Sequence, residues 1–266
     1  MNNINFNENM LKKFGFRFGT GGVHTSRTMM LDELYNLLEF VDNDLAEKDK
    51  YISAIVEENC LGKRSANTRQ ITATKLSLLY ALDPNVTIFQ SLLYFWNKDE
   101  EGRPLLALLC AYSRDPILRL SLPFITSFNE GEWIRREELE HFIEQKEPER
   151  FTRVTLASTA KNINSTWTQS GHLIGRVKKI RSRAKATSGA ISYALLLGYL
   201  TGVRGKLLFE TDYIKLLDCS IEKAIEMAED ASRRGWITFK RLGDIIEVRF
   251  PDFLTKDEMG WKYEYE

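Results

Sequence analysis

The stretch "SIEKAIEMAEDASRRGWITFKRLGDIIEVRF" (residues 220–250) carries the clearest secondary-structure signals in the chain. Ser220 is a good N-cap residue for the helix that would follow it, and Gly235 is a good residue to end that helix. Beyond Gly235, apolar residues alternate with polar ones on both sides of "RLGD", at Ile237, Phe239, Ile246, Val248 and Phe250. Alternation around a short polar turn predicts a two-stranded β-hairpin.

A helix, a glycine and a two-stranded ribbon in this order are the arrangement of a winged helix-turn-helix. Residues 150–186 contain a weaker version of it. The segment "FTRVTLASTAKNINSTWTQSG" places Leu156, Ala160, Ile163 and Trp167 at helical spacing, so this stripe is expected to face the interior. Gly171 would end the helix, and "HLIGRVKKIRSRAKA" beyond it is short, β-capable and densely basic.

The first half of the chain shows no alternation of strands and helices, and its apolar residues recur at helical spacing. The predicted fold is therefore mainly α: an N-terminal helical bundle with a winged helix-turn-helix-like C-terminal half that carries a small β-hairpin. We expect an N-terminal helical domain at 1–130, a basic winged-helix-like segment at 131–187, and C-terminal helices plus the hairpin at 188–266.

The composition is that of an ordinary soluble globular protein, with 43% apolar and 28% charged residues among 266. The longest apolar runs are shorter than the roughly 18–20 residues of a membrane span, and no signal peptide is recognisable, so a cytoplasmic location and no membrane partner are expected. Three cysteines and three histidines are scattered. This spacing predicts neither a disulfide framework nor a metal site, and no cofactor.

The charge is unevenly distributed, although the formal net charge is zero. Residues 150–209 contain no Asp or Glu but many basic residues, namely Arg150, Arg153, Lys161, Arg176, Lys178, Lys179, Arg181, Arg183, Lys185, Arg204 and Lys206. Such an asymmetry indicates a polyanionic partner.

Two groups in this segment are the main candidates for DNA contact. The polar face of the predicted helix holds side chains that hydrogen-bond phosphates and base edges: Ser158, Lys161, Asn162, Ser165 and Gln169. The basic stretch after it would act as a wing that grips the flanking backbone: Arg176, Lys178, Lys179, Arg181, Arg183 and Lys185. The alternative is a solvated helix face followed by a basic loop. If five to eight phosphates are neutralised, affinity should fall by roughly two to four decades between 50 and 200 mM salt.

The helix at 220–234 differs from this one in charge. It carries Glu222, Glu226, Glu229 and Asp230, which would repel phosphate, so a structural or protein-binding role is expected. Arg233, Lys240, Arg241 and Arg249 leave a peripheral contact with DNA open.

The stretch "NCLGKRSANTRQ" (residues 59–70) superficially resembles a phosphate-binding loop. It lacks the first glycine of G-x-x-x-x-G-K-[ST], and helical sequence precedes it. Two interpretations stay open for Lys63, Arg64, Ser65 and Arg69. They could contact a phosphate at a helix N-terminus, or they could form a solvated turn that pairs with Glu57 or Glu58.

Motifs of catalysis are absent from the sequence. His24 and Ser26 lie in a glycine-rich turn with no acidic residue at motif spacing, and no H-E-x-x-H, G-x-S-x-G or D-x-D-x-D occurs. We therefore expect a protein that is not an enzyme.

The stretch "VEENCLGKRSANTRQ" resembles the (V/E)EEN-L-x-KRS-x-x-T signature of the BrxA family, which belongs to BREX phage-resistance systems. Gly21-Gly22, "LLCAYSRDPIL" and "LLGYLTGVRG" also fit, so the resemblance runs from about residue 21 to 253. The signature falls on Glu57, Glu58, Asn59, Leu61, Lys63, Arg64, Ser65 and Thr68.

The resemblance implies a non-enzymatic, mostly helical protein that binds double-stranded DNA and acts beside the BREX methyltransferase and other subunits. It also implies a helical region similar to a transcription antitermination factor. We therefore expect a DNA-binding component with little sequence preference. The alternatives are an RNA-binding module and a scaffold subunit whose basic segment docks on acidic protein partners.

Overall fold

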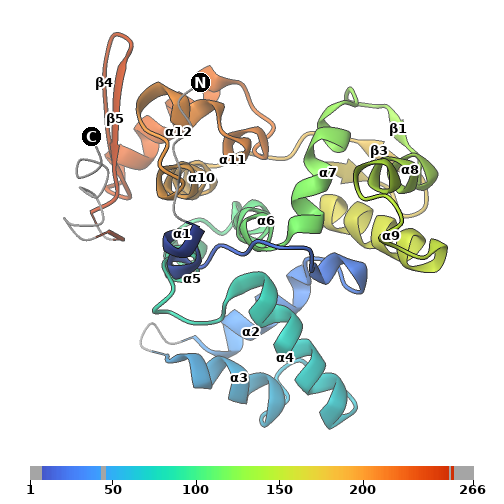
Figure 1. Cartoon of the computed structure of the whole chain (residues 1–266). Helices are drawn as coiled ribbons and strands as arrows, with labels where there is room; N and C mark the ends of the chain where they lie inside the picture. The colour runs from blue at the N-terminus through green and yellow to red at the C-terminus, as the bar shows by residue number, and fades with distance from the viewer. Residues whose placement is uncertain (1–7, 43–45, 252, 255–266) are drawn as a thin grey trace.

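A computed structural model of the chain describes residues 8–42, 46–251, 253 and 254. The described part is mainly helical and carries a small antiparallel β-hairpin, as the sequence predicts. The first half consists of helices only: α1 (Glu8–Phe14), the short 3₁₀ helix η1 (Val23–Thr25), α2 (Leu31–Phe40), α3 (Lys48–Val56), α4 (Ala66–Tyr80), α5 (Thr87–Lys98) and α6 (Arg103–Arg114) (Figure 1).

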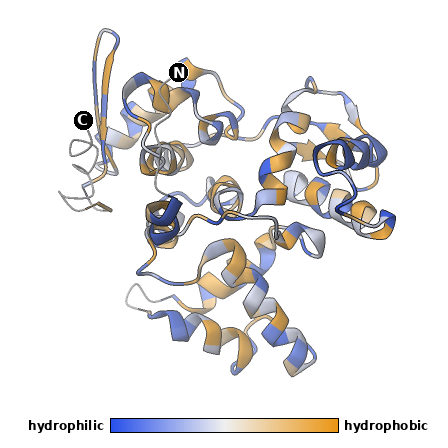
Figure 2. Cartoon of the chain, in the orientation of Figure 1, coloured by the Kyte–Doolittle hydropathy of each residue, from blue (hydrophilic) through white to orange (hydrophobic). Residues whose placement is uncertain are grey.

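The middle of the chain forms a unit of three helices and a small sheet. Its elements are α7 (Pro116–Thr126), β1 (Trp133–Ile134), α8 (Arg136–Lys146), α9 (Arg153–Gln169), β2 (Leu173–Ile174) and β3 (Lys179–Arg181). The three strands are antiparallel in the order β1-β3-β2. Figure 2 shows α8 as largely hydrophilic, and only Leu139 and Ile143 of this helix are buried.

The last part of the chain again consists of helices followed by a two-stranded ribbon. It contains α10 (Ser188–Leu200), the 3₁₀ helix η2 (Gly205–Glu210), α11 (Asp212–Lys215), α12 (Ile221–Arg233) and the hairpin of β4 (Thr238–Leu242) and β5 (Ile245–Arg249). Ser220 caps α12 by accepting a hydrogen bond from the N–H of Lys223, and Gly235 after the helix has a φ of 74°. The predicted hairpin is confirmed, with Phe239, Ile246 and Val248 buried.

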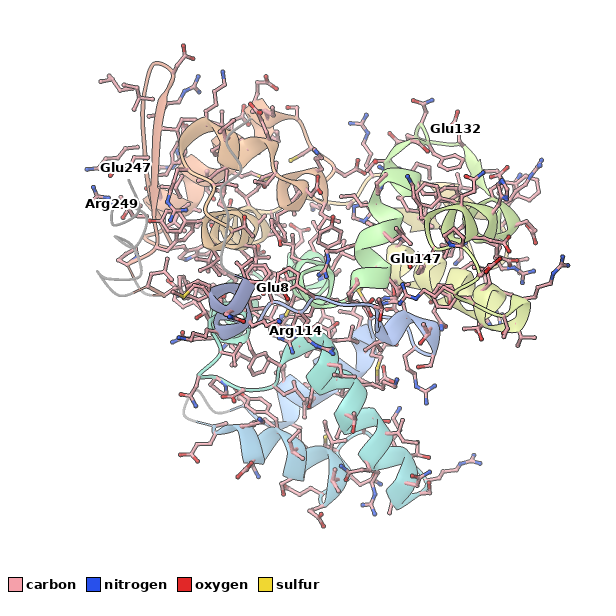
Figure 3. The ribbon with its side chains drawn as sticks, viewed as in Figure 1. Glu8, Arg114, Glu132, Glu147, Glu247 and Arg249 are labelled. Carbon is pink, nitrogen blue, oxygen red and sulfur yellow. The ribbon has the colours of Figure 1, made fainter. Side chains whose placement is uncertain are left out.

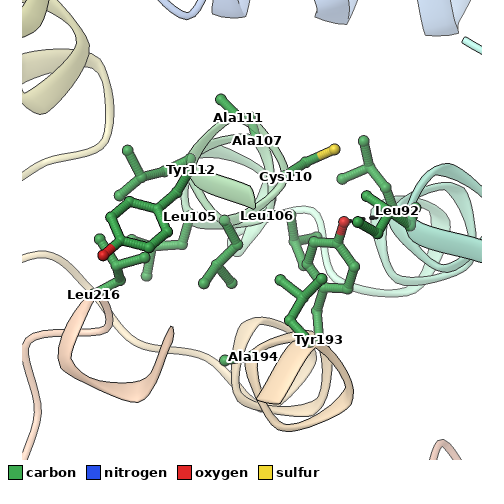
Figure 4. Packing of buried hydrophobic residues seen from close by; sticks show 14 of the residues in the cluster. Leu92, Leu105, Leu106, Ala107, Cys110, Ala111, Tyr112, Tyr193, Ala194 and Leu216 are labelled. Atoms are coloured by element: carbon green, nitrogen blue, oxygen red, sulfur yellow. Dashed lines mark hydrogen bonds between the residues drawn. The ribbon is translucent and has the colours of Figure 1, made fainter. Parts of the chain in front are cut away.

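Helix α6 forms the centre of the molecule because its sequence is apolar on every side. Residues 105–111 of this helix are at most 2% exposed. In Figure 4, Leu106 and Cys110 face Tyr193 of α10 and Leu92 of α5, while Tyr112 faces Leu216. The Tyr193 hydroxyl donates to the Ile88 carbonyl at 2.9 Å, so the polar end of this buried ring has a partner. The core is continuous from the N-terminal helices to the C-terminal hairpin.

Arg114, at the end of α6, ties three segments together where Figure 3 labels it. It donates to the carbonyls of Ser77 and Leu78 in the last turn of α4, both at 3.1 Å, and to the carbonyl of Gly15. The last carbonyls of a helix lack hydrogen-bond partners within the helix and carry partial negative charge. The Arg114 guanidinium donates hydrogen bonds to them and also offsets that charge.

In the part of the chain that the structure describes, no helix is long and apolar enough to cross a membrane.

Candidate nucleic-acid interface

Helix α9 is the element that presents the first group of candidate residues. Thr152 caps it by accepting from the N–H of Thr155 at 3.2 Å, and Gly171 follows its end with a φ of 87°, a conformation that favours glycine. The stripe Leu156, Ala160, Ile163 and Trp167 is buried, as predicted. The opposite side faces solvent over the first half of the helix, as far as Lys161.

This outward stripe carries no carboxylate. Lys161 and Ser158 are exposed and Ser165 is half-exposed, and Arg153 is exposed at the start of the helix. Lys161 and Arg153 form no ion pair with a described residue. The Ser158 hydroxyl donates to the carbonyls of Val154 and Thr155 within the helix, both at 3.1 Å. A row of cations and small hydroxyls remains open to a partner.

Asn162 and Gln169 are placed differently from the prediction. The Asn162 amide donates to the His24 carbonyl at 3.0 Å, and the Gln169 amide donates to the Thr28 hydroxyl at 3.4 Å. Both side chains therefore hold the segment from η1 to α2 against the flank of α9, instead of facing solvent. The sequence gives no signal for this contact, because the partners lie about 140 residues away.

The segment that the sequence predicts as a wing after α9 forms the β2–β3 turn. Gly175 opens it with a φ of 92°, and a Cβ at this position would lie 2.1 Å from the Lys178 carbonyl oxygen, so only glycine fits. Arg176 and Lys178 are exposed in this turn, and Val177 between them is the most exposed large apolar residue described. Lys179 is half-buried and donates to the Gly175 carbonyl at 2.7 Å; partial burial lowers its pKa.

The other three wing candidates pair with acids from elsewhere in the chain. Arg181 is 6% exposed and makes a two-pronged contact with Asp218, at 2.9 and 2.8 Å. Arg183 pairs with Glu130 at 3.1 Å, and Lys185 pairs with Glu101. Arg181 is therefore a buried residue, and the acids beside Arg183 and Lys185 partly compensate their charges. The run of sequence without Asp or Glu thus does not form a surface without acids.

Trp133, which the sequence reasoning did not single out, lies between a cation of the β2–β3 turn and one at the start of α8. Its ring is exposed on β1, with Arg135 at 4.6 Å and Lys178 at 5.0 Å from the ring centroid. Cations at this distance are attracted to the face of an indole ring. The available sequence signal for this contact is the position of Trp133, two residues before Arg135 and just ahead of the charged helix α8.

The "NCLGKRSANTRQ" stretch forms the turn between α3 and α4. Asn59 has a φ of 53° and accepts from the N–H of Lys63 at 2.8 Å, and Ser65 caps α4 by accepting from the N–H of Thr68 at 3.2 Å. The Lys63 ammonium pairs with Glu33 of α2 at 3.1 Å. The BrxA-like signature residues thus have structural roles in the turn, and Lys63 is bound to an acid other than the two expected.

Arg64 is the exposed cation of this turn and has no ion pair within the described ranges, while Arg69 is half-buried. The turn lies at the lower end of the molecule in Figure 1, away from the α7–β3 unit, so the structure does not bring the two basic groups into one patch. Arg27 is closer to α9: it is exposed and lies between His24 and Thr28, which bind α9. The sequence reasoning missed this arginine.

A buried chain of polar groups has the order of a catalytic triad. His24 Nδ1 lies 2.9 Å from Asp115 and His24 Nε2 lies 2.9 Å from the Thr166 hydroxyl. All three side chains are at most 1% exposed, and the Thr166 hydroxyl also accepts from the N–H of Met29. No substrate reaches such a group in this conformation, so its role here is to join η1, α7 and α9.

Asp115 is the centre of that junction. It also accepts from the N–H groups of Val23 and Ile117. Burial acts to raise the pKa of Asp115, but the charge and hydrogen bond of His24, together with backbone N–H groups, outweigh it and lower the pKa to about 2. Within the described residues, no three His, Cys, Asp or Glu side chains converge in a way that could hold a metal.

No protein-family model matches this chain, and no curated protein is similar to it.

Proposed function

We propose that residues 116–181 form a winged helix that binds double-stranded DNA with little sequence preference. The element order α7, β1, α8, α9, β2, β3 and the strand order β1-β3-β2 support this. In such a unit α9 would be the recognition helix and the turn from Gly175 to Lys178 would be the wing.

The observation that carries the proposal is the absence of carboxylates from the outward stripe of α9, combined with the exposed Arg176 and Lys178 in the turn of the same unit. Duplex phosphates attract such a surface without regard to sequence. Asn162 and Gln169, whose amides could read base edges, are engaged with the η1 segment. Low specificity follows from this.

Salt dependence tests the proposal. The exposed cations of α9, of the β2–β3 turn and of the neighbouring η1–α2 segment that form no ion pair with a described residue are Arg27, Arg153, Lys161, Arg176 and Lys178. If four or five phosphates are neutralised, affinity for a duplex should fall by about two to three decades between 50 and 200 mM salt. Because Arg181, Arg183 and Lys185 are paired, this is less than the full basic run would produce. A flat salt response would contradict the proposal, and tighter binding of a structured RNA competitor would favour the RNA alternative.

We further propose that this DNA-binding component acts in a BREX phage-defence system. The support is the resemblance of residues 56–70 to the BrxA signature and the tight α3–α4 turn that these residues build. Deletion of the gene from a host that carries a complete BREX operon should restore plaque formation by a restricted phage. An unchanged plating efficiency would contradict this role and leave the DNA-binding proposal untouched.

A further inference from the structure

The outer face of the β1–β3–β2 sheet carries a row of apolar side chains (Figure 1). Trp133 and Ile174 both pair with Ile180, so these three residues form one row across the three strands. Neighbouring residues in each strand point to the opposite face, where Ile134 and Leu173 are buried. The row therefore faces solvent, and Trp133 and Ile174 are 46% and 54% exposed.

Two cations lie against the indole ring of Trp133 on this face. The guanidinium of Arg135 lies 4.6 Å from the ring centroid, and the ammonium of Lys178 lies 5.0 Å from it. Arg135 is two residues beyond Trp133, and Lys178 is two residues before Ile180, so both belong to the face of the row. One further step in the β1–β3 register places Arg135 directly opposite Lys178. Like charges at opposite positions of an antiparallel pair repel each other.

Neighbouring acids do not pair with these two cations. Glu132 accepts a hydrogen bond from the N–H of Asn129 at 2.7 Å, and Glu138 accepts one from the N–H of Arg135 at 3.3 Å. Neither carboxylate forms an ion pair with the side chain of Arg135 or Lys178, and both cations are exposed. A bound anion between Arg135 and Lys178 would offset their repulsion.

An aromatic ring beside two cations has the chemistry to bind one nucleotide. A base that stacks on an aromatic side chain is bound more strongly than an exposed cation is held by a ring, so a base can replace a cation on the indole. Both cations are then available to the phosphate of that nucleotide. Bases inside a duplex are already stacked and paired, so only an unpaired nucleotide can bind in this way.

The apolar row leaves space for a second base. Ile174 lies two strands away from Trp133, a distance of about 10 Å at the usual strand spacing. Val177, in the turn that joins β2 and β3, is 93% exposed and extends the apolar surface. A single strand could therefore run across the sheet from Trp133 towards Ile174.

We propose that this face binds a single-stranded segment of DNA, with one base stacked on Trp133 and its phosphate between Arg135 and Lys178. The inference rests on the proposed DNA binding and specifies the form of DNA: a duplex that continues into a single strand. Lys178 belongs both to this face and to the turn that would contact the duplex. The two parts of the DNA would therefore bind to adjoining surfaces.

Fluorescence anisotropy of the full chain with two tailed duplexes tests the inference. Each duplex carries a single-stranded tail of about six nucleotides, and in one of them the tail has sugars and phosphates but no bases. The two tails have the same charge, so a difference in affinity reports contacts with the bases alone. The wild type should bind the tail with bases about tenfold more tightly, as expected for one stacked base.

Three variants identify the residue that is responsible. Trp133→Ser should remove the difference between the two tails, and Trp133→Phe should retain part of it because a ring remains. The matched control is Leu242→Ser, which removes an 80% exposed apolar side chain from the β4–β5 hairpin and should keep the full difference. Melting curves check that each variant is folded.

A fluorescent base gives a second readout that does not depend on affinity. The emission of 2-aminopurine in the tail falls when this base stacks on an aromatic ring. At saturating protein the emission should fall with the wild type and with Leu242→Ser, and it should fall much less with Trp133→Ser.

The outcomes separate this inference from the proposed function. A wild type that binds a blunt duplex with the expected salt dependence, but binds both tails equally, would overturn this inference alone; the same result is expected if a protein covers the face. Retention of the full difference by Trp133→Ser would also overturn it. A folded wild type that binds neither blunt nor tailed duplex would contradict the proposed function and this inference together.

Discussion

The units α7–β3 and α10–β5 share a layout and differ in surface. Each has three α-helices and ends in an antiparallel ribbon of two strands, to which the first unit adds β1, whereas the second contains the 3₁₀ helix η2. In each, a serine or threonine caps the third helix and a glycine with positive φ follows it. The third helix α9 carries no acid, whereas α12 carries Glu222, Glu226, Glu229 and Asp230. The same backbone plan thus supports one surface suited to phosphate and one that repels it, because outward side chains are not constrained by packing.

The two units also differ in how they are anchored. The first is held to the N-terminal helices by the buried His24–Asp115–Thr166 chain, and to the second unit by Arg181 and Asp218. The second packs on α6 through α10, whose residues are buried almost throughout. A polar anchor depends on each partner, while an apolar one is spread over many contacts.

The largest effect should come from Asp115→Asn. The change removes a buried charge that binds His24 and several N–H groups, and breaking a buried pair costs about 3–5 kcal/mol. Asp230→Asn is the matched change in the second unit. Asp230 is 30% exposed and binds Ser188 and Arg234, so the expected loss is below about 1 kcal/mol. Urea unfolding measures both, and equal losses would contradict the difference in anchoring.

The pH dependence of stability should report on His172, which connects the two units. His172 of the first unit donates from Nε2 to the carbonyl of Leu216 in the second at 2.9 Å, and its Nδ1 lies 2.9 Å from the Ser170 hydroxyl. Burial lowers the pKa of His172 to about 4 from 6.5. As the pH falls, His172 therefore becomes protonated at a higher pH in the unfolded chain than in the folded one.

The free energy of unfolding should accordingly drop by about 3 kcal/mol between pH 7 and pH 4, and most of this loss should fall below pH 6.5. In His172→Gln the slope over this range should be much smaller. Asp115, whose pKa of about 2 in the folded chain lies below its ordinary 3.8, begins to reduce stability only near pH 4, at the lower end of the range. An unchanged slope would show that His172 is not the group that titrates.

The charge difference between the units can be tested by removing cations from each. Lys161→Ala, Arg176→Ala and Lys178→Ala together should lower duplex affinity by about 30- to 100-fold and reduce the salt slope by about three. The control removes three cations from the second unit: Lys223→Ala, Arg233→Ala and Lys240→Ala. It should bind within about twofold of the wild type, since acids surround these positions. Fluorescence-anisotropy titration measures both affinities. Equal losses of duplex affinity in the two triple variants would contradict the proposal that the first unit, and not the second, binds DNA.

The smallest effects concern the two ribbon turns. Gly175→Ala places a methyl group against the Lys178 carbonyl at a φ of 92°, whereas Gly243→Ala meets nothing within 4 Å at a φ of 59°. Gly243→Ala should cost about 1 kcal/mol for the left-handed backbone alone, and Gly175→Ala should cost more, about 2 kcal/mol. Thermal melts compare them, and the first change should also weaken DNA binding because it displaces Arg176 and Lys178.

Much of the fold was predictable because it follows from local patterns. The buried stripe of α9, the caps at Ser65 and Ser220, and the hairpin alternation around "RLGD" each depend on residues within a few positions of one another. The candidate site was less predictable. Arg176 and Lys178 are exposed as expected, but Asn162 and Gln169 are covered by a segment about 140 residues away, and Trp133 and Arg27 were not foreseen.

The sequence by itself determined which segments are helical, where the ribbon turns, and that one helix lacks acids while its counterpart has four. Only the tertiary structure decided which cations are free. Glu101 and Asp218 lie 84 and 37 residues from the cations that they neutralise, Lys185 and Arg181. Periodicity is a property of neighbouring residues in the chain, whereas the Coulomb interaction depends on distance in space, and only the folded chain determines that distance.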